Sequence, residues 1–186
     1  KEAEASRASA LNATQVSIGR LGEFLNNGTL SAKNAGVLLA DAKVTLDDLA
    51  KTENQSLEIS KIEILLLLNF SDVHVALGEH DLALSRAERA AVISERLLNR
   101  FPENKELTRN IYASRFRIGD EKARTRNNQD AEAQYTSALT IARELASSDP
   151  GNADRQRNVA FILNKVADLN KIRRDYKTAM GQYTEG

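Results

Sequence analysis

The two prolines of the chain, Pro102 and Pro150, stand 48 residues apart and mark an internal repeat. Shifting the sequence by 48 positions aligns residues 91–138 with residues 139–186 without a gap, and 12 of the 48 aligned positions are identical. Ordinary amino-acid composition would give roughly three identities by chance. An internal period of about 20 to 50 residues is typical of a solenoid, in which each unit buries its apolar face against the next.

Helical periodicity runs through every long segment, and no alternating strand pattern with turn pairs is present. We therefore expect an all-α fold of eight helices, with stop signals at residues 26–28, Gly78, Pro102 and residues 149–151. The expected N-caps are Ser31, Ser56, Asn104 and Asn152. Because six of the seven residues 62–68 are apolar, we expect the third helix to be buried against more than one neighbour. A plain eight-helix bundle is the alternative, and the gap-free period favours a stacked array.

The residue types needed for most catalytic and metal chemistry are scarce. Cysteine is absent, which excludes disulfides, thiolate nucleophiles and cysteine-bound zinc. The only two histidines, His74 and His80, are six residues apart with Gly78 between them, so we expect no metal site. No phosphate-binding loop, dinucleotide fingerprint, nucleophile elbow or paired-histidine zinc motif is present. We therefore expect a protein that is not an enzyme and that uses no cofactor.

The charges balance over the whole chain but not along it. The chain has 26 Lys and Arg against 26 Asp and Glu, which gives no general attraction to nucleic acid or anionic lipid. Residues 1–100 carry 11 basic and 14 acidic side chains, net −3, whereas residues 101–186 carry 15 and 12, net +3. This basic excess fits an acidic partner segment, or a solvated surface whose basic side chains have no partner protein.

No targeting or membrane segment is visible. The longest aliphatic run, residues 64–68, is far shorter than the roughly 18 residues that a membrane helix needs. No apolar core follows the basic start at Lys1, so no signal peptide is visible in this sequence. We expect a cytoplasmic segment of a longer protein that binds neither membrane nor nucleic acid.

The predicted fifth and sixth helices resemble a tetratricopeptide repeat. That family places a small residue in the first helix and an Ala/aromatic/Ala-Leu series in the second, and the matching residues here are Gly119, Ala131, Tyr135, Ala138 and Leu139. Tyr176, Ala179 and Tyr183 repeat the series, and Gly78, Ala83 and Ala90 form a weaker copy. Leu67, Arg115 or Leu163 replaces the usual first-helix tryptophan, and the period is 48 rather than 34. The extra length predicts helices about two turns longer than usual, roughly 30 Å each.

The resemblance implies a right-handed α-solenoid of antiparallel helix pairs. It predicts an N-terminal helical hairpin over residues 1–55 and repeats at about 56–102, 103–150 and 151–186, the last one truncated. The segment around residues 142–169 is similar to long repeats C-terminal to TIR-like, caspase-like or STAND-type NTPase modules in bacterial signalling and defence proteins. The implied function is non-catalytic binding of a protein or peptide partner, as the sensor or regulatory region of a larger protein.

A candidate binding groove also follows from the resemblance. By the family's spacing, Asp72, Asp120 and Asp168 occupy one first-helix position that lines the concave face, where they would form a row of carboxylates. The same spacing places Arg124, Asn164 and Lys171 on or near that groove. Asn, Lys and Arg side chains there could hold a peptide backbone or carboxylate. The alternative is that each aspartate forms a structural ion pair with a nearby base, such as Lys165 or Lys171 beside Asp168.

Two other functions compete with partner binding. The stripe Leu11, Ile18, Leu21 and Leu25 suits a coiled coil, and Met180 and Tyr183 belong to an apolar face of the last helix. These features fit a self-association module that forms a homo-oligomer. A helical enzyme is the other alternative, and it would need a deep polar pocket with a perturbed acid or base.

Overall fold

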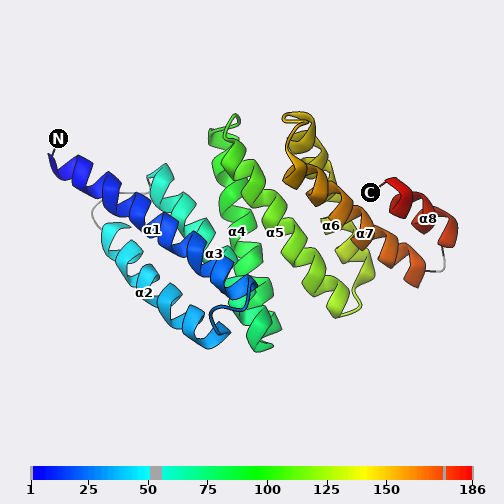
Figure 1. Cartoon of the computed structure of the whole chain (residues 1–186), viewed down its shortest axis with the longest axis horizontal. Coiled ribbons are helices and arrows are strands. Elements are labelled where there is room, and N and C mark those ends of the chain that lie inside the picture. Colours follow the sequence, from blue (N-terminus) through cyan, green and yellow to red (C-terminus); the bar gives the residue numbers. More distant parts are fainter. Residues whose placement is uncertain (1, 51–55, 174, 186) are drawn as a thin grey trace. The chain divides into compact units, whose positions relative to one another are not determined.

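The computed structural model describes residues 2–50, 56–173 and 175–185, and these residues form eight α-helices and no strand (Figure 1). The helices are α1 (Glu2–Asn26), α2 (Ala32–Ala50), α3 (Leu57–Leu77), α4 (His80–Arg100), α5 (Lys105–Arg124), α6 (Asn128–Ser147), α7 (Ala153–Ile172) and α8 (Tyr176–Glu185). The all-α prediction is confirmed for this part of the chain. Helices α3 to α7 contain 20 or 21 residues each, which corresponds to about 30 Å.

Side-chain caps fix the starts of four helices where the sequence predicted them. At the start of α2, the Ser31 hydroxyl accepts a hydrogen bond from the Asn34 backbone N–H at 3.3 Å. The Ser56 hydroxyl accepts a hydrogen bond from the Ile59 backbone N–H at 3.2 Å. The Asn104 side-chain oxygen accepts from Leu107 N–H at 3.2 Å, and Asn152 caps α7 in the same way. Each cap satisfies a backbone donor that has no partner inside its helix, and losing one typically costs about 1 kcal/mol.

Gly78 ends α3 and does not occupy the middle of a helix. Its backbone is left-handed, with φ of 76°, and its N–H reaches the carbonyl of Val75 at 3.0 Å. A side chain is strained in this conformation, so glycine is favoured there. The expectation that Gly78 is the small first-helix residue of a repeat is therefore wrong. The residue 48 positions before Gly119 is Ser71, which is fully buried in α3 and donates its hydroxyl to the Ala83 carbonyl at 2.9 Å.

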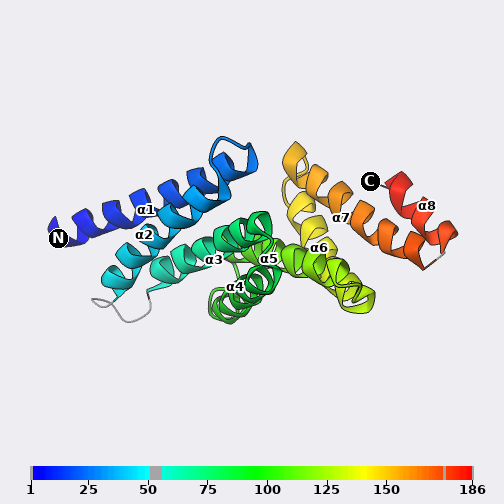
Figure 2. The same cartoon turned by 90° about the horizontal axis from the view of Figure 1, so that it is seen from below.

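The chain divides into two compact units, Lys1–Glu103 and Asn104–Gly186. In the first unit, α3 packs against α1, α2 and α4, and Figure 2 shows it between α2 and α4. The prediction that the apolar third helix has several neighbours is confirmed. The core of this unit consists of Ile18, Ala35, Leu39, Leu46, Ile59, Ile62, Leu66 and Val73.

In the second unit, each helix packs against the next one in the sequence, from α5 to α8. Its core consists of Ala131, Tyr135, Ala138, Leu139, Ile162, Leu163, Val166 and Leu169. Four of these residues form the Ala/Tyr/Ala-Leu series that suggested the repeat family. The stacking of helix pairs into a solenoid and the repeat boundaries at residues 102 and 150 stay predictions. No helix in the described ranges has both the length and the apolar character needed to cross a membrane.

Candidate interaction surface

The aspartates at the repeated position in the second unit each accept a hydrogen bond from a tyrosine 15 residues later. The Tyr135 hydroxyl donates to Asp120 Oδ1 at 2.5 Å, and the Tyr183 hydroxyl donates to Asp168 Oδ1 at 2.6 Å. The two pairs are 48 residues apart, so the sequence repeat is also a repeat of a contact. Burial and the bond to Asp120 raise the pKa of Tyr135 well above its usual value, and the hydroxyl therefore stays a donor. Each carboxylate is thus held in a fixed orientation.

A lysine links α7 to α5 across this face. Lys165 Nζ lies 2.9 Å from Asp120 Oδ1, and the two side chains are 32% and 35% exposed. The same ammonium group lies 5.5 Å from the ring centroid of Phe116 and 5.4 Å from that of Phe161. Ammonium groups at such distances from aromatic faces are attracted to them. Lys165 therefore joins a carboxylate and two aromatic rings from two helices.

The two phenylalanines form an aromatic pair that solvent can reach. Phe116 on α5 and Phe161 on α7 have ring centroids 5.3 Å apart and an interplanar angle of 54°, a favourable tilted arrangement. Phe161 keeps 48% of its surface exposed. We define the α5–α7 surface as the side chains of Phe116, Asp120, Phe161, Asn164, Lys165 and Asp168. It offers an apolar patch beside hydrogen-bonding groups of both signs, which suits binding.

Five of the six predicted groove residues lie on α5 and α7 of the second unit, and one lies in the first unit. Asn164 and Asp168 are exposed on α7 and share a helix face with Phe161, because residues three, four and seven apart are neighbours on a helix. Asp72 lies on α3 in the first unit. Arg124 is the last residue of α5, where its Nε lies 3.0 Å from Glu121 Oε2. The sixth predicted residue, Lys171, is exposed in the last turn of α7.

Lys165 pairs with a different aspartate from the one that the sequence suggested. It reaches Asp120 on α5, although Asp168 lies only three residues further along its own helix. The sequence also did not single out Phe116 or Phe161. Each of them precedes a charged residue of the surface by four positions, and this spacing places ring and charge on one helix face.

Several basic side chains of the second unit form ion pairs within the unit. Arg173 on the α7–α8 connection bonds both carboxylate oxygens of Glu132, at 2.6 and 2.8 Å, and this bond raises the pKa of Arg173. Arg157 and Asp154 pair at 2.7 Å in the first turns of α7. Residues 104–186 carry 15 basic and 11 acidic side chains, net +4, so an excess of positive charge remains over the unit. A partner with acidic residues would complement it.

The described residues hold no group of three histidine, cysteine, aspartate or glutamate side chains that could bind a metal ion. His74 is in the last turn of α3, where its Nδ1 lies 2.6 Å from Glu79 Oε2, and His80 begins α4 beyond Gly78.

A scan against protein-family models finds no match to this chain, and a search of curated proteins finds none either. The functional assignment therefore depends on the sequence repeat and on the geometry described above.

Proposed function

We propose that this chain is a non-catalytic interaction module of the tetratricopeptide type, a right-handed α-solenoid with elongated helices. In this proposal the α5–α7 surface binds a protein or peptide segment. The single observation that carries it is the accessible Phe116–Phe161 pair, fixed beside Lys165 and two tyrosine-bonded aspartates. An exposed aromatic group with oriented polar neighbours is what an interface uses as an anchor.

The polar groups of the surface suggest what the partner contains. Lys165 already neutralises Asp120, and the unit as a whole carries a net positive charge. Asn164 is exposed and can both donate to and accept from a peptide backbone. The favoured partner is therefore a segment with one apolar side chain for the aromatic pair and acidic residues nearby.

The test is a peptide library displayed against the immobilised chain, followed by affinity measurements on a selected peptide. The peptide is titrated by fluorescence polarisation into the wild type, Phe161→Ala and Lys165→Ala. Phe161→Ala should weaken binding at least about tenfold, as expected for truncating an anchor. Lys165→Ala should weaken the binding of acidic peptides, more strongly at low salt than at high salt.

Arg157→Ala is the matched control. It removes one positive charge from the same helix, at a side chain that is 75% exposed and paired with Asp154. Its affinity for the selected peptide should equal that of the wild type, with circular dichroism checking that each variant is folded. Peptides that bind Phe161→Ala as tightly as the wild type would place the binding surface elsewhere and refute the proposal.

Self-association is a second candidate, because several large apolar side chains at the α7–α8 end are exposed. Ile172 keeps 64% of its surface accessible, Met180 70% and Tyr183 42%. Large exposed apolar side chains near one end of a chain can mark contacts between chains. Sedimentation of the wild type and Met180→Glu tests it: a mass above that of the monomer that falls in the variant supports self-association, and a monomer throughout contradicts it.

The resemblance also supports a finer proposal, that the chain is the regulatory repeat region of a larger bacterial signalling protein in the cytoplasm. Sequencing the whole gene tests this point. An effector or NTPase module on the same polypeptide would support it, and a gene that encodes only helical repeats would count against it.

A further inference from the structure

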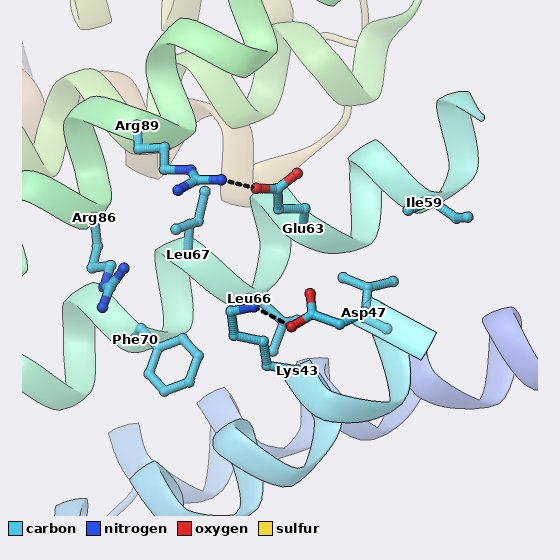
Figure 3. A pocket seen from close by; sticks show the side chains of 10 residues that line it. Lys43, Asp47, Ile59, Glu63, Leu66, Leu67, Phe70, Arg86 and Arg89 are labelled. Carbon is cyan, nitrogen blue, oxygen red and sulfur yellow. Dashed lines mark hydrogen bonds and ion pairs between the residues drawn. The ribbon is translucent and has the colours of Figure 1, made fainter. Parts of the chain in front are cut away.

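A cavity of about 220 Å³ lies in the first unit, where α2, α3 and α4 meet (Figure 3). Its apolar lining consists of Leu46, Ile59, Leu66, Leu67 and Phe70. The first four of these are buried, with 3 to 6% of their surface exposed. The charged lining consists of Lys43, Asp47, Glu63, Arg86 and Arg89. The site is in a different unit from the α5–α7 surface and does not depend on the function proposed for it.

Both carboxylates of the cavity are neutralised by lining residues. Lys43 Nζ lies 2.5 Å from Asp47 Oδ2 on α2, and Arg89 on α4 reaches Glu63 Oε1 on α3 at 2.6 Å. Figure 3 shows these two ion pairs on opposite walls. The fifth charged group is Arg86, so the lining carries a net positive charge.

Arg86 has a different environment from the other two cations. Its guanidinium lies 5.9 Å from the ring centroid of Phe70, and its Nε is buried with no hydrogen-bond partner among the described residues. A guanidinium binds carboxylates through two parallel hydrogen bonds, and Arg86 is among the residues that line the cavity. Figure 3 shows Arg86 and Phe70 together at one end of the cavity, with Ile59 and Asp47 toward the other. The cavity therefore has a cationic end next to an aromatic ring and a floor of aliphatic side chains.

We infer that this cavity binds a small amphipathic carboxylate, with its carboxylate on Arg86 and an aromatic or branched apolar body over Leu66 and Leu67. The size of the ligand follows from the volume. An engineered apolar cavity of about 150 Å³ holds benzene, so 220 Å³ has room for one ring and a short carboxylate arm. A cationic ligand is disfavoured, because both carboxylates of the lining already have cationic partners.

The first test uses the wild-type chain and three probes in isothermal titration calorimetry. The probes are 3-phenylpropionate, the neutral 3-phenylpropanamide with the same ring and arm, and acetate as the head group alone. We expect saturable binding of 3-phenylpropionate, at least about tenfold tighter than that of the amide and of acetate, since hydrogen bonds to charged groups are the stronger ones. Absence of saturable binding, or equal binding of the amide or of acetate, would overturn the inference.

The second test locates the site with Arg86→Gln. This variant keeps a polar side chain but loses the charge, so the preference for the acid over the amide should fall about tenfold or more. Arg100→Gln is the matched control, because it removes an exposed arginine from the same helix outside the cavity and should keep the preference. Retention of the preference in a folded Arg86→Gln would refute the assignment. The probe comparison on the wild type decides the question even if that variant does not fold.

Discussion

Gly119→Ala tests the close approach of α5 to the Tyr135 ring on α6. Gly119 lies inside α5, in its C-terminal third, and a Cβ there would approach Tyr135 Cε1 to 2.6 Å and Cδ1 to 2.7 Å. Tyr135 has only 2% of its surface exposed, and its hydroxyl is tied to Asp120. The ring therefore has little room to move away, so a methyl group at position 119 should push α5 and α6 apart.

Two opposing terms set the size of the effect. Replacing glycine by alanine in a helix interior stabilises by about 0.5–1 kcal/mol. Overpacking a tight contact costs about 1–3 kcal/mol. The balance predicts a loss of about 1 kcal/mol in the free energy of unfolding, or a fall of about 4–8 °C in the melting temperature of a unit of this size.

Tyrosine fluorescence measures this unit alone. The chain has no tryptophan, and all four tyrosines, at positions 112, 135, 176 and 183, lie within residues 104–186. Urea unfolding followed by this signal therefore reports the second unit separately from the first. Gly181→Ala is the control, because a Cβ at that position of α8 meets no described atom within 4 Å and should not destabilise.

A double-mutant cycle isolates the contact between the two residues. In a Tyr135→Ala background the space for the methyl group exists, so adding Gly119→Ala should become neutral or stabilising. At the two corresponding positions, 48 residues earlier, the first unit has two small side chains, Ser71 and Ala87. If Gly119→Ala alone is as stable as the wild type, the close approach of α5 to the Tyr135 ring is refuted.

Two further stability predictions follow from single contacts. Tyr135→Phe should cost about 1 kcal/mol at neutral pH through the lost bond to Asp120. Because the pKa of Tyr135 is raised in the folded state, its contribution is present below the ordinary tyrosine pKa of about 10 and is lost as the pH rises above it. The wild type should therefore lose stability between pH 9 and pH 11 more steeply than Tyr135→Phe does, as measured by urea midpoints from circular dichroism. Arg155→Ala should cost about 1–3 kcal/mol, because its guanidinium donates to the Leu145 carbonyl at 2.8 Å and to Ser148 Oγ at 3.0 Å at the end of α6. The exposed Arg157→Ala should change the melting temperature little, and equal effects of the two variants would contradict this role of Arg155.

The helix ends were predictable because their signals are local. Ser56 and Asn104 cap helices through bonds to residues two or three positions away, and Gly78 closes α3 within one turn. The apolar stretch 62–68 likewise predicts several neighbours from its own composition. Such features depend only on adjacent residues, so they can be inferred before the tertiary structure is known.

The binding features depend on contacts between distant residues and were mostly missed. Lys165 is three residues from Asp168, yet it pairs with Asp120, because its reach is set by how α7 packs beside α5. Phe116 and Phe161 occupy positions that do not correspond in the 48-residue alignment, where they face Asn164 and Ala113. The cavity around Arg86 takes its lining from three helices, and no segment of the sequence contains its pattern.

The close contact between Gly119 and the Tyr135 ring has a consequence for how the repeated positions can evolve. At the two aligned positions the chain has Ser71 with Ala87, Gly119 with Tyr135, and Ala167 with Tyr183, and Gly119 lies against the Tyr135 ring. The buried ring of Tyr135 leaves room only for glycine at position 119, so positions 119 and 135 are constrained to vary together. Replacing only one of these two residues by its counterpart from a neighbouring repeat should therefore destabilise the chain, whereas replacing both should be tolerated. Evolution of the repeats should accordingly favour gene conversion of long segments over the exchange of single residues.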